Sequence, residues 1–63
     1  MNGKQVIAKL KADGWHLVRI EGSHHILEKG GRPRAIPVPV HGNKDLGTGL
    51  LAAIQRQSGV KLK

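Results

Sequence analysis

The chain has 63 residues, enough for one domain, which we place over residues 1–63. It contains no cysteine, which excludes disulfides and thiolate metal sites. Its 11 lysines and arginines against 4 aspartates and glutamates give a formal net charge of +7. A charge this high on so short a chain favours a polyanionic partner such as RNA, DNA or an acidic protein. The sequence has neither an apolar run that could span a membrane nor a secretory signal at its start, so we expect a cytoplasmic protein.

The first expected element is a helix that begins near Asn2. Asn2 can cap this helix, and Gln5 stands three residues later, as in a capping box. Gly14 is typical of the residue that follows a helix C-terminus. Trp15 is the only aromatic residue, so we expect it in the core rather than stacked on a base. The apolar face of the helix is formed by Val6, Ile7 and Leu10.

Three strands are expected next, over residues 15–21, 24–29 and 34–40. Gly22-Ser23 is a two-residue hairpin signal, and residues 29–32 form the second turn. Proline has no N–H to donate to a neighbouring strand, so the third strand must lie at an edge. Its prolines all occupy odd positions, which places the missing donors on one side, the free edge. These prolines are Pro33, Pro37 and Pro39.

The two-residue turn sets a register for the first hairpin. It pairs Glu21 with His24, and each preceding residue of the first strand then pairs with the next residue of the second strand. The alternation then puts His25 on the face covered by helices and His24 on the opposite, open face. A slip of one residue would exchange these two roles. The remaining expected pairs are Ile20 with His25, Arg19 with Ile26, and Val18 with Leu27, so that Val18, Ile20 and Leu27 face the helices.

A second helix closes the sequence. Asp45 or Thr48 can cap it, and Gly59 should end it. The sequence does not decide whether residues 60–63 dock onto the domain. The expected fold class is α+β, in the order α-β-β-β-α, with a three-stranded antiparallel sheet and two helices on one face. The apolar face of this helix is formed by Leu50, Leu51 and Ile54.

Histidine titrates near neutral pH and can accept or donate a proton there. The chain has four histidines, and their spacing matches no zinc motif, so we expect no metal and no cofactor. His24 is the one that the register places within reach of a ligand. For a histidine pair beside a turn, the alternative is an ordinary structural role in the strand. The four are His16, His24, His25 and His41.

The chain resembles the HicA family of toxins from toxin–antitoxin pairs. The resemblance covers nearly the whole chain, although the family usually has Gly-Thr where this chain has Gly49-Leu50. It implies a fold similar to a double-stranded-RNA-binding domain, an mRNA interferase activity that stops growth, and neutralisation by a HicB-like antitoxin. The family's active histidine corresponds to His24. The residues that carry the resemblance are Gly14-Trp15, Arg19, Gly22-Ser23-His24-His25, Ile36-Pro37-Val38-Pro39, His41, Leu46, Gly49, Ile54 and Gly59.

RNA carries its own nucleophile, the 2′-hydroxyl, so a histidine such as His24 can promote cleavage as general base or acid without a metal. The expected activity is therefore a metal-independent endoribonuclease acting on mRNA. Two alternatives stay open: a non-catalytic double-stranded-RNA-binding module, and a partner for an acidic protein. Whether His25 or His41 assists His24 stays open too, and nothing argues for a homo-oligomer. The expected RNA-binding residues are Arg19, Ser23, Lys29, Arg32, Arg34 and Lys44.

Overall fold

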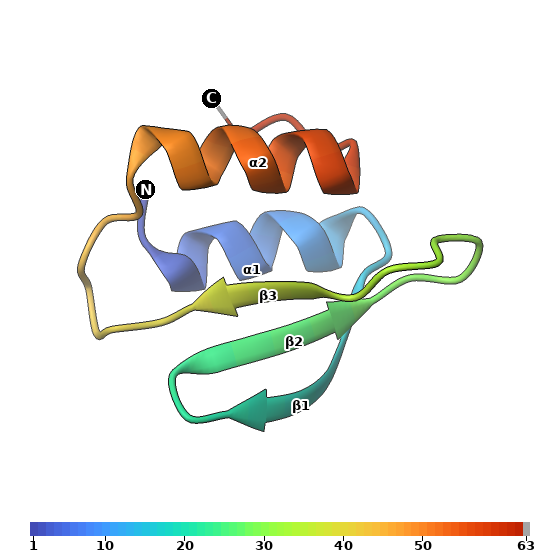
Figure 1. Cartoon of the computed structure of the whole chain (residues 1–63), viewed down its shortest axis with the longest axis horizontal. Coiled ribbons are helices and arrows are strands. Elements are labelled where there is room, and N and C mark those ends of the chain that lie inside the picture. Colours follow the sequence, from blue (N-terminus) through green and yellow to red (C-terminus); the bar gives the residue numbers. More distant parts are fainter. Residues whose placement is uncertain (63) are drawn as a thin grey trace.

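The structure is a computed structural model, and it describes residues 1–62. Its elements are α1 (Gly3–Ala12), β1 (His16–Glu21), β2 (His24–Glu28), β3 (Ile36–Pro39) and α2 (Thr48–Ser58) (Figure 1). The strands form one antiparallel sheet in the order β1-β2-β3. Both helices contact β3, and the expected order α-β-β-β-α is confirmed. Within residues 1–62, no helix is long and apolar enough to cross a membrane.

The start of α1 is fixed by the expected capping box. The Asn2 side chain accepts a hydrogen bond from the Gln5 backbone N–H at 2.9 Å, and the Gln5 side chain accepts one from the Asn2 N–H at 2.8 Å. The first helical residue, Gly3, lies against the end of β3. A Cβ atom at Gly3 would lie 2.3 Å from the carbonyl oxygen of Pro39. Only glycine allows α1 to approach the strand this closely.

The start of α2 differs from the expectation. Its N-cap is Gly47, which makes no side-chain capping bond, and Thr48 is already the first helical residue. The prediction that Asp45 or Thr48 caps this helix is therefore wrong. Asp45 instead lies beside the first residues of the chain, where its carboxylate is 3.3 Å from the Met1 ammonium and its backbone pairs with Asn2. The helix ends at Gly59, as predicted.

One core joins the helices to the inner face of the sheet. Trp15 is 2% exposed and belongs to this core, as expected. The segment after α2 docks as well, because the Leu62 N–H donates to the Gln55 side chain at 2.8 Å and the Leu62 side chain is buried. The buried cluster comprises Val6, Ile7, Leu10, Trp15, Leu27, Ile36, Val38, Leu51, Ile54 and Leu62.

The first hairpin has the expected register over the three pairs nearest its turn, but not beyond them. A β-bulge at Val18 makes Leu17, rather than Val18, the partner of Leu27. Val18 and Ile20 are 45% and 56% exposed, so the prediction that they pack beneath the helices is wrong. β1 is the edge strand on the side of the sheet away from β3, the strand that both helices contact (Figure 1).

The prolines of β3 mark a free edge, as predicted, although the strand is shorter than expected. Pro37 pairs with Ile26 and Pro39 with His24. Just beyond the strand, the Val40 N–H donates to the Ser23 carbonyl at 2.8 Å. Even-numbered residues of this segment therefore point their N–H groups toward β2, and the proline nitrogens point away from it.

Candidate active site

One face of the sheet is free of helices, and we call it the open face. Side chains alternate along a strand, so the residues that precede and follow the buried Leu27, Ile36 and Val38 in sequence point to this face. The paired positions of the open face combine charged, imidazole and apolar side chains in a small area. They are Arg19, Glu21, His24, Ile26, Pro37 and Pro39.

His24 lies in the central strand, β2, between Glu21 of β1 and Pro39 of β3. Its side chain is exposed, which agrees with the expectation from the register. The turn before it requires glycine, because Gly22 has a φ of 61°, in the left-handed region. A rigid backbone thus presents the imidazole to solvent, where it can act as proton donor or acceptor to a bound ligand.

Arg19 and Glu21 lie two residues apart on β1 and form an ion pair in which the Arg19 Nε donates to a Glu21 carboxylate oxygen. This hydrogen bond and the charge of Glu21 raise the pKa of Arg19. Arg19 was expected to bind RNA. The structure pairs its guanidinium with Glu21, and both side chains are more than half exposed. The spacing of two residues between opposite charges on one strand is the signal that could have revealed the pair.

His25 belongs to the other face. It pairs with Ile20 on one side and Val38 on the other, its side chain is half-buried, and its Nδ1 is buried without a hydrogen-bond partner. The prediction that His25 lies on the face opposite His24 is confirmed. His24 and His25 therefore do not share a ligand-facing surface. In the part of the chain that the structure describes, no three His, Asp or Glu side chains gather as metal ligands.

Two expected RNA-binding residues and one further histidine lie at the same end of the sheet as His24. Ser23 belongs to the turn, and Lys44 to the loop that follows β3, which leaves the sheet beside this turn (Figure 1). His41 opens that loop, and its carbonyl accepts from the Lys44 N–H at 3.1 Å. His41 and Lys44 are both exposed. This loop therefore carries an exposed imidazole and an exposed cation at the end of the sheet where His24 lies.

The remaining expected RNA-binding residues lie at the opposite end of the sheet, in the turn between β2 and β3. The Lys29 ammonium is 2.8 Å from the Asp13 carboxylate, and this contact lowers the pKa of Asp13. Arg32 and Arg34 border a hollow of about 200 Å³. The structure therefore separates these three cations from His24 by the length of β2. The hollow is completed by Pro33, Ile36 and Gln57.

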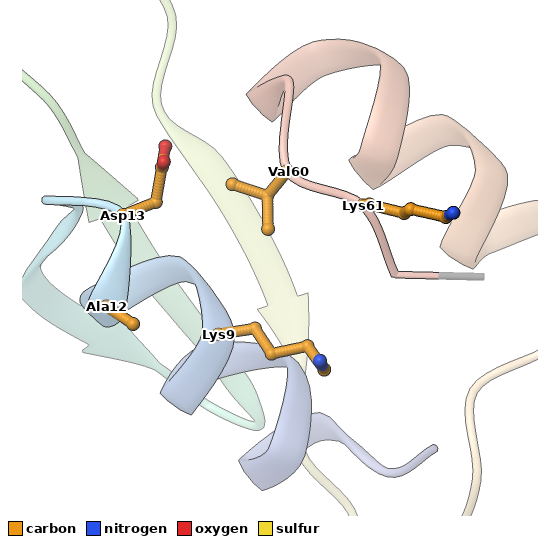
Figure 2. Close-up of a pocket in the computed structure, with 5 residues that line it drawn as sticks. All are labelled: Lys9, Ala12, Asp13, Val60 and Lys61. Atoms are coloured by element: carbon orange, nitrogen blue, oxygen red, sulfur yellow. The ribbon is translucent and has the colours of Figure 1, made fainter.

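A second hollow, of about 300 Å³, lies between the end of α1 and the segment after α2. Figure 2 shows Lys9 and Ala12 on the helix, with Val60 and Lys61 on the facing segment. It contains no histidine, and its carboxylate, Asp13, is already engaged by Lys29. The open face is therefore the better candidate for acid–base chemistry.

Comparisons with known proteins show the family of the chain. The profile of the family described as "HicA toxin of bacterial toxin-antitoxin" matches residues 3–60. A solved structure, "HicA3 and HicB3 toxin-antitoxin complex", is similar over 100% of both chains, with 33% sequence identity and a TM-score of 0.85. No curated protein matches the chain. Because the family profile spans nearly the whole chain and a solved member has the same fold, the chain belongs to the HicA family of toxins.

Proposed function

We propose that this protein is the toxin of a toxin–antitoxin pair and an endoribonuclease that cleaves mRNA, with His24 as its general acid or base. The observation that carries the proposal is the exposed imidazole of His24 on the open face of a basic HicA-family domain. Cleavage of mRNA inhibits translation and growth, and it places the protein's action in the cytoplasm.

The proposed reaction uses the nucleophile that RNA already contains. His24 removes the proton of a 2′-hydroxyl, and the oxygen attacks the adjacent phosphorus. The bond to the 5′-oxygen of the next nucleotide then breaks, which leaves a 2′,3′-cyclic phosphate and a 5′-hydroxyl. A positioned proton donor or acceptor contributes about 10²- to 10⁴-fold to such a step. Cationic side chains near the phosphate stabilise the negative charge that develops on it.

Cations at both ends of the sheet can contribute to RNA binding. Lys44 lies at the His24 end of the sheet, and Arg32 and Arg34 lie at the other end. The five residues of β2 separate the two ends by ~16 Å at 3.3 Å per residue. Arg32 and Arg34 border a hollow that Gln57 of α2 also lines, so an RNA strand that contacts both ends must pass from the open face toward the helix side at the far end. The cations at the far end would then bind the backbone, while His24 acts on one phosphate.

A HicB-like antitoxin is the proposed protein partner. The similar solved structure is a complex of a HicA with a HicB protein, which supports this assignment. The net charge of +7 favours an acidic partner surface, and a surface that covers His24 would block the substrate as well.

The test is cleavage of a defined single-stranded RNA, followed by mass spectrometry of the ends. The reaction is run with and without a chelator. Fragments with 2′,3′-cyclic phosphate and 5′-hydroxyl ends in both conditions support the proposal. Fragments with 3′-hydroxyl and 5′-phosphate ends, or activity lost in chelator, contradict the mechanism. Tight, salt-dependent binding without any cleavage would favour a non-catalytic RNA-binding module.

A further inference from the structure

A second histidine, His41, follows β3 at the end of the sheet where His24 lies. In the β2–β3 ladder, His24 pairs with Pro39, and the hydrogen bond from Val40 to Ser23 extends this ladder by one position beyond the strand. His41 is the next residue. It is therefore the diagonal neighbour of His24, because it lies two positions after Pro39, the residue directly opposite His24.

The alternation of side chains puts His41 on the same side of the sheet as His24. Val38 is buried in the core and Val40 packs against it, whereas Pro37 and Pro39 pair with residues of the open face. His41 continues the second series. Diagonal neighbours across two antiparallel strands have side chains roughly 7–8 Å apart. At this separation, two imidazoles can each reach a different oxygen of one phosphate bound between them.

The loop that begins at His41 is held at both of its ends. At the start, the Lys44 N–H donates to the His41 carbonyl at 3.1 Å. Further on, the Leu46 N–H donates to the Met1 carbonyl at 2.9 Å, and Asp45 pairs with Asn2. These contacts tie the loop to the start of α1, so the backbone at His41 is positioned by the fold.

The other polar groups on this part of the open face are less suited to deliver a proton. A guanidinium is not deprotonated in proteins, which excludes Arg19 as a proton donor. Glu21 accepts the hydrogen bond of Arg19 through its carboxylate. His25 lies on the opposite face. Among the residues that the ladder brings beside His24, His41 is the one with an imidazole, a side chain that can both donate and accept a proton.

We propose that His41 is a second catalytic residue, the general acid that complements His24 as general base; this inference rests on the proposed ribonuclease activity. The neutral imidazole of His24 takes the proton of the 2′-hydroxyl as the 2′-oxygen–phosphorus bond forms. The imidazolium of His41 gives its proton to the 5′-oxygen as the phosphorus–5′-oxygen bond breaks. The products are the cyclic phosphate, the 5′-hydroxyl, imidazolium at His24 and neutral imidazole at His41. Proton exchange with water then restores both side chains.

The test uses two substrates and three variants of the full chain. The first substrate is a normal RNA, on which the cleaved bond of the wild type is located. In the second, sulfur replaces the 5′-bridging oxygen at that bond, which makes a leaving group that needs no proton. The variants are His24→Ala, His41→Ala and the control His16→Ala. His16 is exposed and pairs with Glu28, at the other end of the same sheet. Thermal unfolding confirms that each variant is folded.

On normal RNA, His41→Ala should cleave about 10²- to 10⁴-fold more slowly than the wild type, and His16→Ala at the wild-type rate. On the sulfur-containing RNA, His41→Ala should recover to near the wild-type rate, while His24→Ala stays slow. Two results overturn the role of His41. Either His41→Ala cleaves normal RNA at the wild-type rate, or it loses the same factor in cleavage rate on both substrates. Neither result affects the proposed ribonuclease. Absence of cleavage by the wild type overturns that function, and the role of His41 with it.

Discussion

Glu21 and His24 face each other across the turn Gly22-Ser23, on the face of the sheet that no helix covers. Their pairing depends on a turn of two residues, and that turn depends on the left-handed backbone of Gly22, with a φ of 61°. The position of the candidate active site is therefore set by one backbone conformation. A Cβ atom at Gly22 would meet nothing within 4 Å, so glycine is required here by the backbone conformation and not by lack of space.

Replacement of Gly22 by alanine should thus destabilise the protein through the backbone alone, by about 1–2 kcal/mol. Gly30 is the matched control, because it is also an unobstructed turn glycine but has no left-handed φ. Urea unfolding of both variants measures the difference. An equal effect of Gly22→Ala and Gly30→Ala would show that the φ of Gly22 does not control stability.

Leu27 of β2 and Ile20 of β1 lie on the same face of the sheet, yet their different burial predicts unequal costs for apolar truncation. Leu27 is fully buried, so Leu27→Ala should cost about 2–5 kcal/mol, a large part of the total for a domain of this size. Ile20 is 56% exposed, so Ile20→Ala should cost well under ~1 kcal/mol. Unfolding midpoints in urea compare the two. A cost of several kcal/mol for Ile20→Ala would mean that the helices cover β1.

Two glycines near helix starts should respond to alanine in opposite directions. Gly3→Ala should destabilise the fold, because the new Cβ atom would lie 2.3 Å from the backbone oxygen of Pro39 and force α1 away from β3. Gly49 lies in the first turn of α2 with open space around it, so Gly49→Ala should stabilise the protein by about 0.5–1 kcal/mol. Melting temperatures that shift in the same direction for both variants would contradict this account.

The ion pair of Lys29 and Asp13 predicts a pH dependence. Lys29 lowers the pKa of Asp13, so the pair stabilises the folded state above the ordinary pKa of an aspartate, ~3.9, and this contribution is lost as the pH falls through the lowered value. Lys29→Gln should therefore be less stable than the wild type at pH 7, and the gap should close in acid. A gap that stays constant from neutral pH to pH 2 would exclude this origin.

The sequence was sufficient to predict what local rules determine. The capping box at Asn2, the end of α2 at Gly59, the edge strand marked by prolines and the opposite orientations of His24 and His25 all follow from spacing over a few residues. Each of these features depends on a backbone conformation or a register that neighbouring residues fix.

What could not be predicted depends on contacts between distant segments. The bulge at Val18 leaves no glycine or proline signal, and the exposure of Ile20 follows from how far the helices extend across the sheet. Asp45 was expected to cap α2, but its partner is the start of the chain. The pairing of Lys29 with Asp13, across 16 positions of sequence, belongs to the same class. Alternation along the first hairpin places His24 and Arg19 on one face. The position of His41 relative to His24 depends instead on the register between β2 and β3.

The most direct measurement of the central claim is cleavage of a defined single-stranded RNA by three purified proteins: the wild type, His24→Ala and His16→Ala. Both histidines are exposed, so neither substitution should disturb the core, which thermal unfolding would verify. The account predicts that the wild type and His16→Ala cut the RNA at the same rate and that His24→Ala does not cut it. Cleavage by His24→Ala at the wild-type rate would contradict the assignment of His24 as the catalytic residue.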